Sequence, residues 1–424
     1  MKEGFIDESG RKHIFACGVE FIIEDGVLIS CEGELGGMLE LPVEVEEIGE
    51  RVFKGAKMTC VKIPDSVKSI WIEAFKGCDA LEEVVFGKEL ITIYDEAFDG
   101  CTSLKNVTLP VGVKAICEKA FRGCASIESV YLPETVSLIG EGAFKGCAAL
   151  KNVTLPAGIT RIRNEVFKEC ASLESVDGGE NVEKIDSGAF RGCEELKNVT
   201  LSKKLYTIGE QAFYGYSKLA EINIPDSVRE IDDFAFCRCS RLVKINGGAG
   251  VGKIGNFAFA LCSRLPRFDV FEGTEIIGRK ALSGCMFLKE VNLGDKVVEI
   301  GDYAFEGMIA EEIELPKSVK RIGGGAFFNC GLLRKVSAQC GDSVIGRDTF
   351  GGCYFISEII LPSNLREIRK GAFTGCRVLR ELTLPESVEE VQVGAFDVNC
   401  GTHITAPARL KESKGLKGLN VTFV

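Results

Sequence analysis

Apolar and polar positions repeat along this chain with a period of 23 residues. Each period contains an L-x-x-V-x-L segment, in which apolar and polar residues alternate, and proline follows in most periods. Alternation with a period of two predicts a short β-strand with one buried face. Proline ends such a strand because it has no N–H to donate to a β-ladder. Ten of the eleven prolines occupy this position, so proline marks the turns of the repeat.

One position of the repeat is occupied almost always by phenylalanine and fixes its register. We call this position the slot. Thirteen of the fifteen steps between its sixteen positions are 23 residues long, and two are 22. Self-similarity at a fixed period of this length predicts a solenoid, in which each turn buries the apolar edges of its neighbours. The slot residues are Phe53, Phe75, Phe98, Phe121, Phe144, Phe167, Phe190, Phe213, Phe236, Phe259, Leu282, Phe305, Phe327, Phe350, Phe373 and Phe396.

Small residues flank the slot. Alanine precedes it in thirteen of sixteen turns, and glycine follows two residues later in eleven. We interpret both as positions where adjacent turns approach closely, and we expect the phenylalanine rings to stack along the solenoid. Parallel strands of successive turns should lie about 4.8 Å apart. The predicted fold is a mainly β repeat solenoid with one short parallel strand per turn, turns or 3-10 pieces on the other edge, and few full helices.

The two ends depart from the repeat. Segments 19–23 and 27–30 flank Glu24-Asp25-Gly26 and predict a hairpin within an N-terminal cap, residues 1–40. Residues 41–407 form the predicted solenoid of about 16 turns, and residues 408–424 form a C-terminal cap. The turns from Phe259 to Phe350 are the least regular, with leucine in one slot and several prolines missing.

The repeat resembles the BspA-like class of leucine-rich repeats. Turns such as LPETVSLIGEGAFKGC, residues 132–147, carry the resemblance, which covers about residues 41–407. It implies a right-handed leucine-rich-repeat solenoid and a protein-binding role. Several known members act as surface proteins that bind host proteins, extracellular matrix or other microbes. The resemblance implies no catalytic residue, because the family motif is structural.

Charge and hydropathy exclude some partners. The 424 residues carry a net charge of −11 with a pI near 5.1, which argues against binding to nucleic acid or anionic lipid. Apolar residues make up 46%, yet no apolar run is long enough to span a bilayer. The charged first residues lack the apolar core of a secretory signal, and no anchor is visible.

Nineteen cysteines form the most unusual feature of the composition. Their odd number and the absence of a C-x-x-C pair argue against a disulfide framework and a zinc site, so we expect free, buried thiols. Free thiols predict a cytoplasmic location, whereas the family resemblance implies the cell surface. Twelve cysteines lie three residues after the slot: Cys78, Cys101, Cys124, Cys147, Cys170, Cys193, Cys239, Cys262, Cys285, Cys330, Cys353 and Cys376. At this position, the other turns have Ala56, Tyr216, Met308 and Asn399.

Catalytic and cofactor motifs find little support. Residues 247–255 resemble a phosphate-binding loop, but Ile254 stands where a hydroxyl would reach Mg²⁺, and its register places it in the core. The two histidines, His13 and His403, have no nucleophile or metal-spaced partner in the sequence. We therefore expect no enzyme activity, no cofactor and no metal site.

The outward positions of the strand, eight and ten residues after the slot, form the candidate binding face. They are polar and rich in asparagine, and Tyr131 is the predicted anchor. We expect a protein, or less favourably a glycan, to bind there without catalysis. The alternative is an intracellular scaffold protein that associates with itself or joins a larger complex. The candidate residues are Glu83, Asn106, Tyr131, Asn152, Asp177, Asn198, Asn223, Asn246, Arg267 and Asp269.

Overall fold

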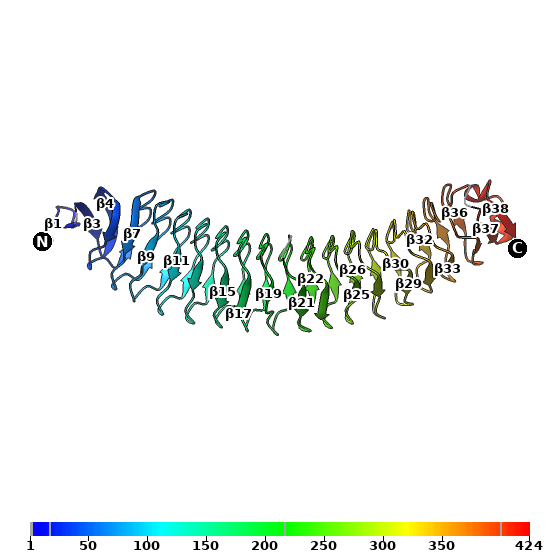
Figure 1. The fold of residues 1–424 in the computed structure, drawn as a ribbon, viewed down its shortest axis with the longest axis horizontal. Coiled ribbons are helices and arrows are strands. Elements are labelled where there is room, and N and C mark those ends of the chain that lie inside the picture. Colours follow the sequence, from blue (N-terminus) through cyan, green and yellow to red (C-terminus); the bar gives the residue numbers. More distant parts are fainter. Residues whose placement is uncertain (1–2, 17, 216–217, 399–400) are drawn as a thin grey trace. The chain divides into compact units, whose positions relative to one another are not determined.

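The computed structural model describes residues 3–16, 18–215, 218–398 and 401–424. It consists of two compact units, Met1–Leu205 and Tyr206–Val424. Within each unit, strands of successive turns lie side by side (Figure 1). This arrangement confirms the predicted β-solenoid, and it adds a second, two-residue strand in each turn that the sequence analysis did not predict.

The first unit begins with an antiparallel meander. It contains β1 (Glu3–Ile6), β2 (Lys12–Ala16), β3 (Val19–Glu24) and β4 (Val27–Gly33). The β3–β4 hairpin turns at Asp25 and Gly26, which both have positive φ angles. Strand β4 then pairs in parallel with β6, so the meander covers the first turn of the repeat.

Two series of parallel strands follow in the first unit. The first-series strands come from the L-x-x-V-x-L segments, and the second-series strands from the V-x-x-I segments. The first series is β5 (Gly36–Glu40), β7 (Lys57–Lys62), β9 (Glu83–Val85), β11 (Asn106–Thr108), β13 (Ser129–Tyr131), β15 (Asn152–Leu155), β17 (Ser175–Gly178) and β19 (Asn198–Val199). The second series is β6 (Glu47–Ile48), β8 (Ser69–Ile70), β10 (Thr92–Ile93), β12 (Ala115–Ile116), β14 (Leu138–Ile139), β16 (Arg161–Ile162) and β18 (Lys184–Ile185).

The second unit repeats this plan. Its first series is β21 (Glu221–Ile224), β23 (Lys244–Gly247), β25 (Arg267–Asp269), β27 (Glu290–Asn292), β29 (Glu312–Leu315), β31 (Lys335–Ala338), β33 (Glu358–Ile360), β35 (Glu381–Thr383), β37 (His403–Ala406) and β38 (Asn420–Phe423). Its second series is β20 (Thr207–Ile208), β22 (Glu230–Ile231), β24 (Lys253–Ile254), β26 (Ile276–Ile277), β28 (Glu299–Ile300), β30 (Arg321–Ile322), β32 (Val344–Ile345), β34 (Glu367–Ile368) and β36 (Glu390–Val391).

The slot phenylalanines form the stacked core that the sequence predicts. From Phe53 to Phe190, neighbouring ring centroids lie 4.9 to 5.9 Å apart with nearly parallel planes. In the second unit, the stack from Phe305 to Phe396 has spacings of 5.1 to 5.7 Å. In most turns the slot N–H also donates to the carbonyl of the residue before the next slot, as Phe98 does to Ala120 at 2.8 Å.

Close approach explains the glycine after the slot in only some turns. A Cβ added at Gly77 would meet no atom within 4 Å, whereas one at Gly375 would lie 3.3 Å from the Gly352 backbone. The position also has a positive φ angle, 72° at Gly77, which glycine adopts without strain. Close approach does explain the glycine of the I-G pair, since a Cβ at Gly140 would lie 2.4 Å from the Cys117 carbonyl carbon.

Helices are nearly absent. In the described parts of the chain, the helical segments are two 3-10 turns, η1 (Ala408–Leu410) and η2 (Lys414–Leu416), which lie between β37 and β38. Between the strands the repeats contain turns, one of the two forms that the sequence analysis left open. Among these residues, no helix has the length and apolarity needed to cross a bilayer.

Candidate functional site

The predicted binding residues all lie on first-series strands and point away from the core. Their neighbours in the strand, such as Val107 and Val153, are buried, as the period of two requires. Tyr131 has 55% of its surface exposed. The residues Glu83, Asn106, Tyr131, Asn152, Asp177 and Asn198 in the first unit are exposed, as are Asn223, Arg267 and Asp269 in the second, whereas Asn246 is half-buried.

The asparagines bond to side chains of the next turn. Ser129 Oγ donates to Asn106 Oδ1 at 2.8 Å, and Ser175 Oγ donates to Asn152 Oδ1 at 2.9 Å. In the second unit, the Asn246 amide donates to Asn223 Oδ1 at 2.8 Å. Part of the hydrogen-bonding capacity of this face is therefore used between adjacent turns of the protein itself, which the sequence analysis did not predict.

A hollow on the first unit brings two predicted residues together. It has a volume of about 770 Å³ and is lined by Glu83 and Asn106, with Val85, Lys105 and Thr108 beside them. Tyr131 pairs in register with Thr108, one strand further on, so its ring stands next to this hollow. In the part of the chain that the structure describes, the Tyr131 side chain has no hydrogen-bond partner. The arrangement offers an aromatic anchor beside a polar recess.

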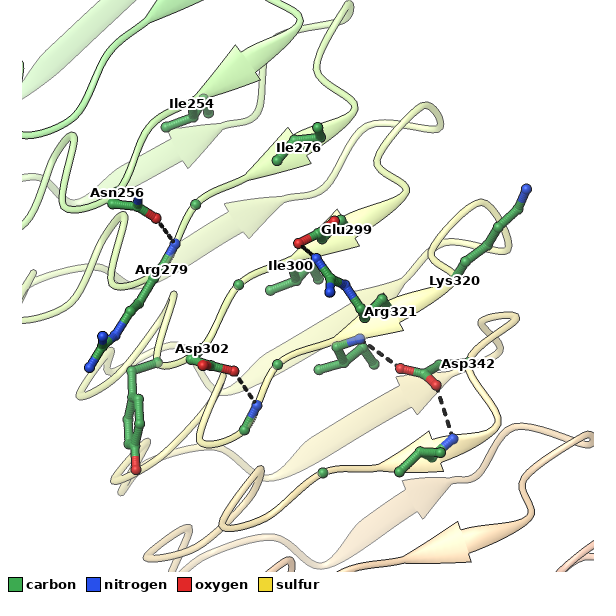
Figure 2. A pocket seen from close by; sticks show the side chains of 18 of the residues that line it. Ile254, Asn256, Ile276, Arg279, Glu299, Ile300, Asp302, Lys320, Arg321 and Asp342 are labelled. Atoms are coloured by element: carbon green, nitrogen blue, oxygen red, sulfur yellow. Dashed lines mark hydrogen bonds and ion pairs between the residues drawn. The ribbon is translucent and has the colours of Figure 1, made fainter.

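A second hollow lies over the second-series strands of the second unit (Figure 2). Its volume is about 860 Å³, and its floor includes the glycines that follow β24, β26, β28 and β30. A Cβ at any of these glycines would lie within 2.7 Å of backbone atoms in the previous turn. The hollow is therefore a consequence of close packing between turns, and the repeated I-G pair is the sequence signal for it. These glycines are Gly255, Gly278, Gly301 and Gly323.

The carboxylates in this hollow have hydrogen-bond or ion-pair partners within the protein. Asp302 Oδ1 accepts a hydrogen bond from the Gly324 N–H at 2.8 Å, and Glu299 forms an ion pair with Arg321 (Figure 2). Asp342 accepts from the N–H groups of Ile322 and Val344, although burial raises the pKa of its carboxyl above the ordinary value. The described side chains thus show structural carboxylates rather than a free acid–base pair.

The twelve cysteines that lie three residues after the slot, which we call the cysteine column, are buried, as predicted. Each Sγ–H lies near a backbone carbonyl of an earlier turn, as Cys124 does to the Phe98 oxygen at 3.1 Å. Burial raises the pKa of the Cys170 thiol to about 12, so this thiol stays protonated near neutral pH. All seventeen described cysteines are free thiols. Cys17 and Cys400 lie outside the described residues, as do Tyr216 and Asn399, which occupy the position of the column in two other turns.

The remaining motifs have structural roles. Ile254 is fully buried, so the glycine-rich segment continues the repeat at that point. His13 lies 2.7 Å from Glu20 and 3.1 Å from Asp7, and these hydrogen bonds raise the pKa of its ring. Across the described residues, no cluster of three or more His, Cys, Asp or Glu side chains has a geometry that would hold a metal ion.

The chain is similar to several proteins of known structure. A leucine-rich repeat protein from Bacteroides ovatus is 26% identical, with 99% of each chain covered and a TM-score of 0.68. A leucine-rich cell surface protein from Faecalibacterium prausnitzii is 22% identical, covering 85% of this chain and 94% of its own, with a TM-score of 0.41. The pneumococcal vaccine antigen PcpA is 16% identical, covering 97% and 96%, with a TM-score of 0.42.

The family model gives the assignment. No curated protein matches the chain. The model for the BspA type leucine-rich repeat region matches residues 46–174, 183–310 and 275–404. These matches cover most of the repeat, including the slot, the cysteine column and both strand series. The chain belongs to the BspA-type leucine-rich repeat family.

Proposed function

We propose that the first unit binds a protein partner on the exposed face of its first-series strands and catalyses no reaction. The observation that carries this proposal is the hollow lined by Glu83 and Asn106, with the exposed ring of Tyr131 beside it. Tyrosine offers a rigid apolar surface together with a hydroxyl group, and it is enriched among the residues that dominate binding energy. The surrounding polar side chains supply hydrogen bonds at the rim.

The mixed charge of this hollow favours a protein over nucleic acid. Glu82 and Glu83 lie beside Lys105, and the Lys105 ammonium forms an ion pair with Glu82. Cys60 adds a thiol whose pKa is raised, mainly by burial and also by the charge of Glu83. No run of unpaired cations exists here to follow a phosphate backbone. The surface instead resembles the polar rim of a protein–protein interface.

Photo-crosslinking tests this proposal directly. A photoreactive phenylalanine analogue at position 131 should capture a partner in cells, and the same analogue at Thr200 is the matched control. Thr200 is also exposed and lies ten residues after its slot, but it is outside the hollow. Tyr131→Ala should then weaken binding of the captured protein by about 2 kcal/mol, or roughly 30-fold, with the thermal midpoint unchanged.

Two results would count against this proposal. Equal capture from position 200 would show that the hollow confers no selectivity. Unchanged affinity in Tyr131→Ala would place the contact elsewhere. Surface labelling of intact cells separates the two settings for such binding, since labelled protein favours adhesion and unlabelled protein in a complex favours an intracellular scaffold.

A further inference from the structure

The edge that follows each cysteine differs between the two units. We define the edge positions as the two residues after the cysteine column. In the first unit they are small or polar: Asp79, Ala80, Thr102, Ser103, Ala125, Ser126, Ala148, Ala149, Ala171, Ser172, Glu194 and Glu195. In the second unit, large apolar residues occupy edge positions in several turns, and they are exposed in three of them, with Met286 and Phe287, Leu332 after a glycine, and Tyr354 and Phe355.

The fold does not require these large side chains. The turn at the edge closes with the same hydrogen bond in both units, from Leu150 N–H to the Cys147 carbonyl at 3.1 Å and from Leu288 N–H to the Cys285 carbonyl at 3.0 Å. Alanine occupies both edge positions between Cys147 and Leu150. Since alanine supports this turn, the aromatic residues are not there to shape the backbone.

The large side chains are also exposed. We call Met286, Phe287, Leu332, Tyr354 and Phe355 the apolar ridge. Their exposed fractions are 61%, 58%, 41%, 43% and 42% respectively. An exposed group of apolar side chains on a soluble surface is a typical mark of an interaction site, and aromatic residues and methionine are enriched at such sites.

A hollow of about 640 Å³ borders the ridge. Leu332 and Ile309 line it on the ridge side, and Lys289, Val291 and Asn292 line it on the strand side. The ridge and the hollow together form a surface that can receive a protruding side chain of a partner. A flat lipid surface would leave this hollow unfilled.

Three cations near the ridge have no ion-pair partner among the described residues, and neither do the exposed carboxylates of Glu314 in β29 and Glu358 in β33. The carboxylates that line the hollow each have a cation in this chain, at 2.9 to 3.7 Å: Glu290 with Arg267, Glu311 with Arg334, and Glu312 with Lys335. In contrast, Arg264, Lys289 and Arg377 form no ion pair with any described residue. The Arg377 guanidinium lies 5.1 Å from the Tyr354 ring centre, and that of Arg334 lies 5.5 Å from the Phe355 ring centre.

We propose that this ridge docks an acidic segment of a partner protein, whose apolar side chains contact the ridge while its carboxylates meet Arg264, Lys289 and Arg377. The apolar contacts would supply most of the affinity, and the charges would select the partner and speed its approach. This surface is separate from the proposed Tyr131 face, which lies on first-series strands of the other unit.

The experiment uses the full chain and a display library of random peptides as the probe. Selected peptides should combine acidic residues with Phe, Leu, Trp or Tyr. Met286→Ala with Phe287→Ser reproduces the Ala125-Ser126 edge of the first unit and should weaken peptide binding roughly 30-fold or more. Arg377→Glu should weaken binding and reduce its dependence on salt. Val111→Ala, at an exposed apolar position outside both proposed surfaces, is the control and should leave peptide affinity unchanged.

Several outcomes overturn the proposal. Selection of basic peptides, or of none, would contradict the acidic partner. Binding to phosphatidylcholine–phosphatidylserine vesicles that is lost in the ridge variant would assign the ridge to a membrane. A dimer in sedimentation that the ridge variant abolishes would assign it to a second copy of this chain. Loss of peptide binding in Tyr131→Ala alone would move the site to the strand face, which separates this proposal from the proposed function.

Discussion

The edges of the two units have the same backbone turn but differ in the polarity of their exposed side chains. In the first unit the edge positions hold alanine, serine, threonine and acidic residues, whereas the second unit presents the apolar ridge. The charges differ as well. Seven residues after the slot, the first unit alternates Glu and Lys, and each lysine pairs with the glutamate one turn earlier. These pairs are Lys105 with Glu82, Lys151 with Glu128, and Lys197 with Glu174.

The fold controls the buried positions of each turn but not the exposed ones. The pairs of the first unit are exposed, and exposed ion pairs contribute only about 0 to 1 kcal/mol each. Their main effect is to balance the charge at this position and to keep it well solvated. The second unit lacks this alternation and leaves Arg264, Lys289 and Arg377 without an ion-pair partner among the described residues. A repeat fold fixes its buried columns and leaves the edge free to vary between units.

The largest expected effect tests whether the two units share one core. Phe144→Ala and Phe327→Ala each remove a fully buried ring that stacks on rings at 5.6 to 5.9 Å on both sides. Each should cost about 3–5 kcal/mol of unfolding free energy, measured by chemical denaturation. The exposed Val111→Ala is the control and should change little. A cost below about 1 kcal/mol in only one unit would break the comparison, because the two edges would then rest on different cores.

A smaller effect concerns the position two residues after the slot. Glycine fits its left-handed backbone, but Glu169 and Leu261 adopt it with φ angles of 63° and 60°. Replacing either residue with glycine should stabilise its unit by about 0.5 to 1 kcal/mol. The free energy gained by relieving backbone strain exceeds the cost of the greater conformational entropy that glycine gives the unfolded chain. Gly192→Ala, at the same position with φ of 77°, should destabilise. Thermal midpoints of the three variants check this, and stabilisation by Gly192→Ala would contradict it.

The buried columns could be predicted from the sequence because their period is visible in it. The Phe slot, the cysteine column and the strand that ends at proline all follow from residue type and spacing. The second-series strands could not be predicted, because a two-residue strand such as Ser69–Ile70 has too few positions to show alternation. The role of the glycine after the slot was also hidden, since composition does not distinguish a left-handed backbone from close approach.

The candidate surfaces were only partly predictable. The period of two placed Glu83, Asn106 and Tyr131 on the exposed face, but it could not show that a hollow joins the first two. The apolar ridge was overlooked because only the strand positions were compared between turns. Comparing the two residues after each cysteine would have found Met286, Phe287, Tyr354 and Phe355 from the sequence alone.

The ridge of the second unit is a surface feature that the fold does not need. The measurement that tests it most directly is the unfolding free energy of Met286→Ala with Phe287→Ser, determined by denaturant titration of the full chain. We expect a loss of less than about 1 kcal/mol, because these positions are exposed and their counterparts in the first unit are alanine and serine. A loss of about 3 kcal/mol or more, equal to that of a core truncation, would contradict it and show that the ridge packs within the protein.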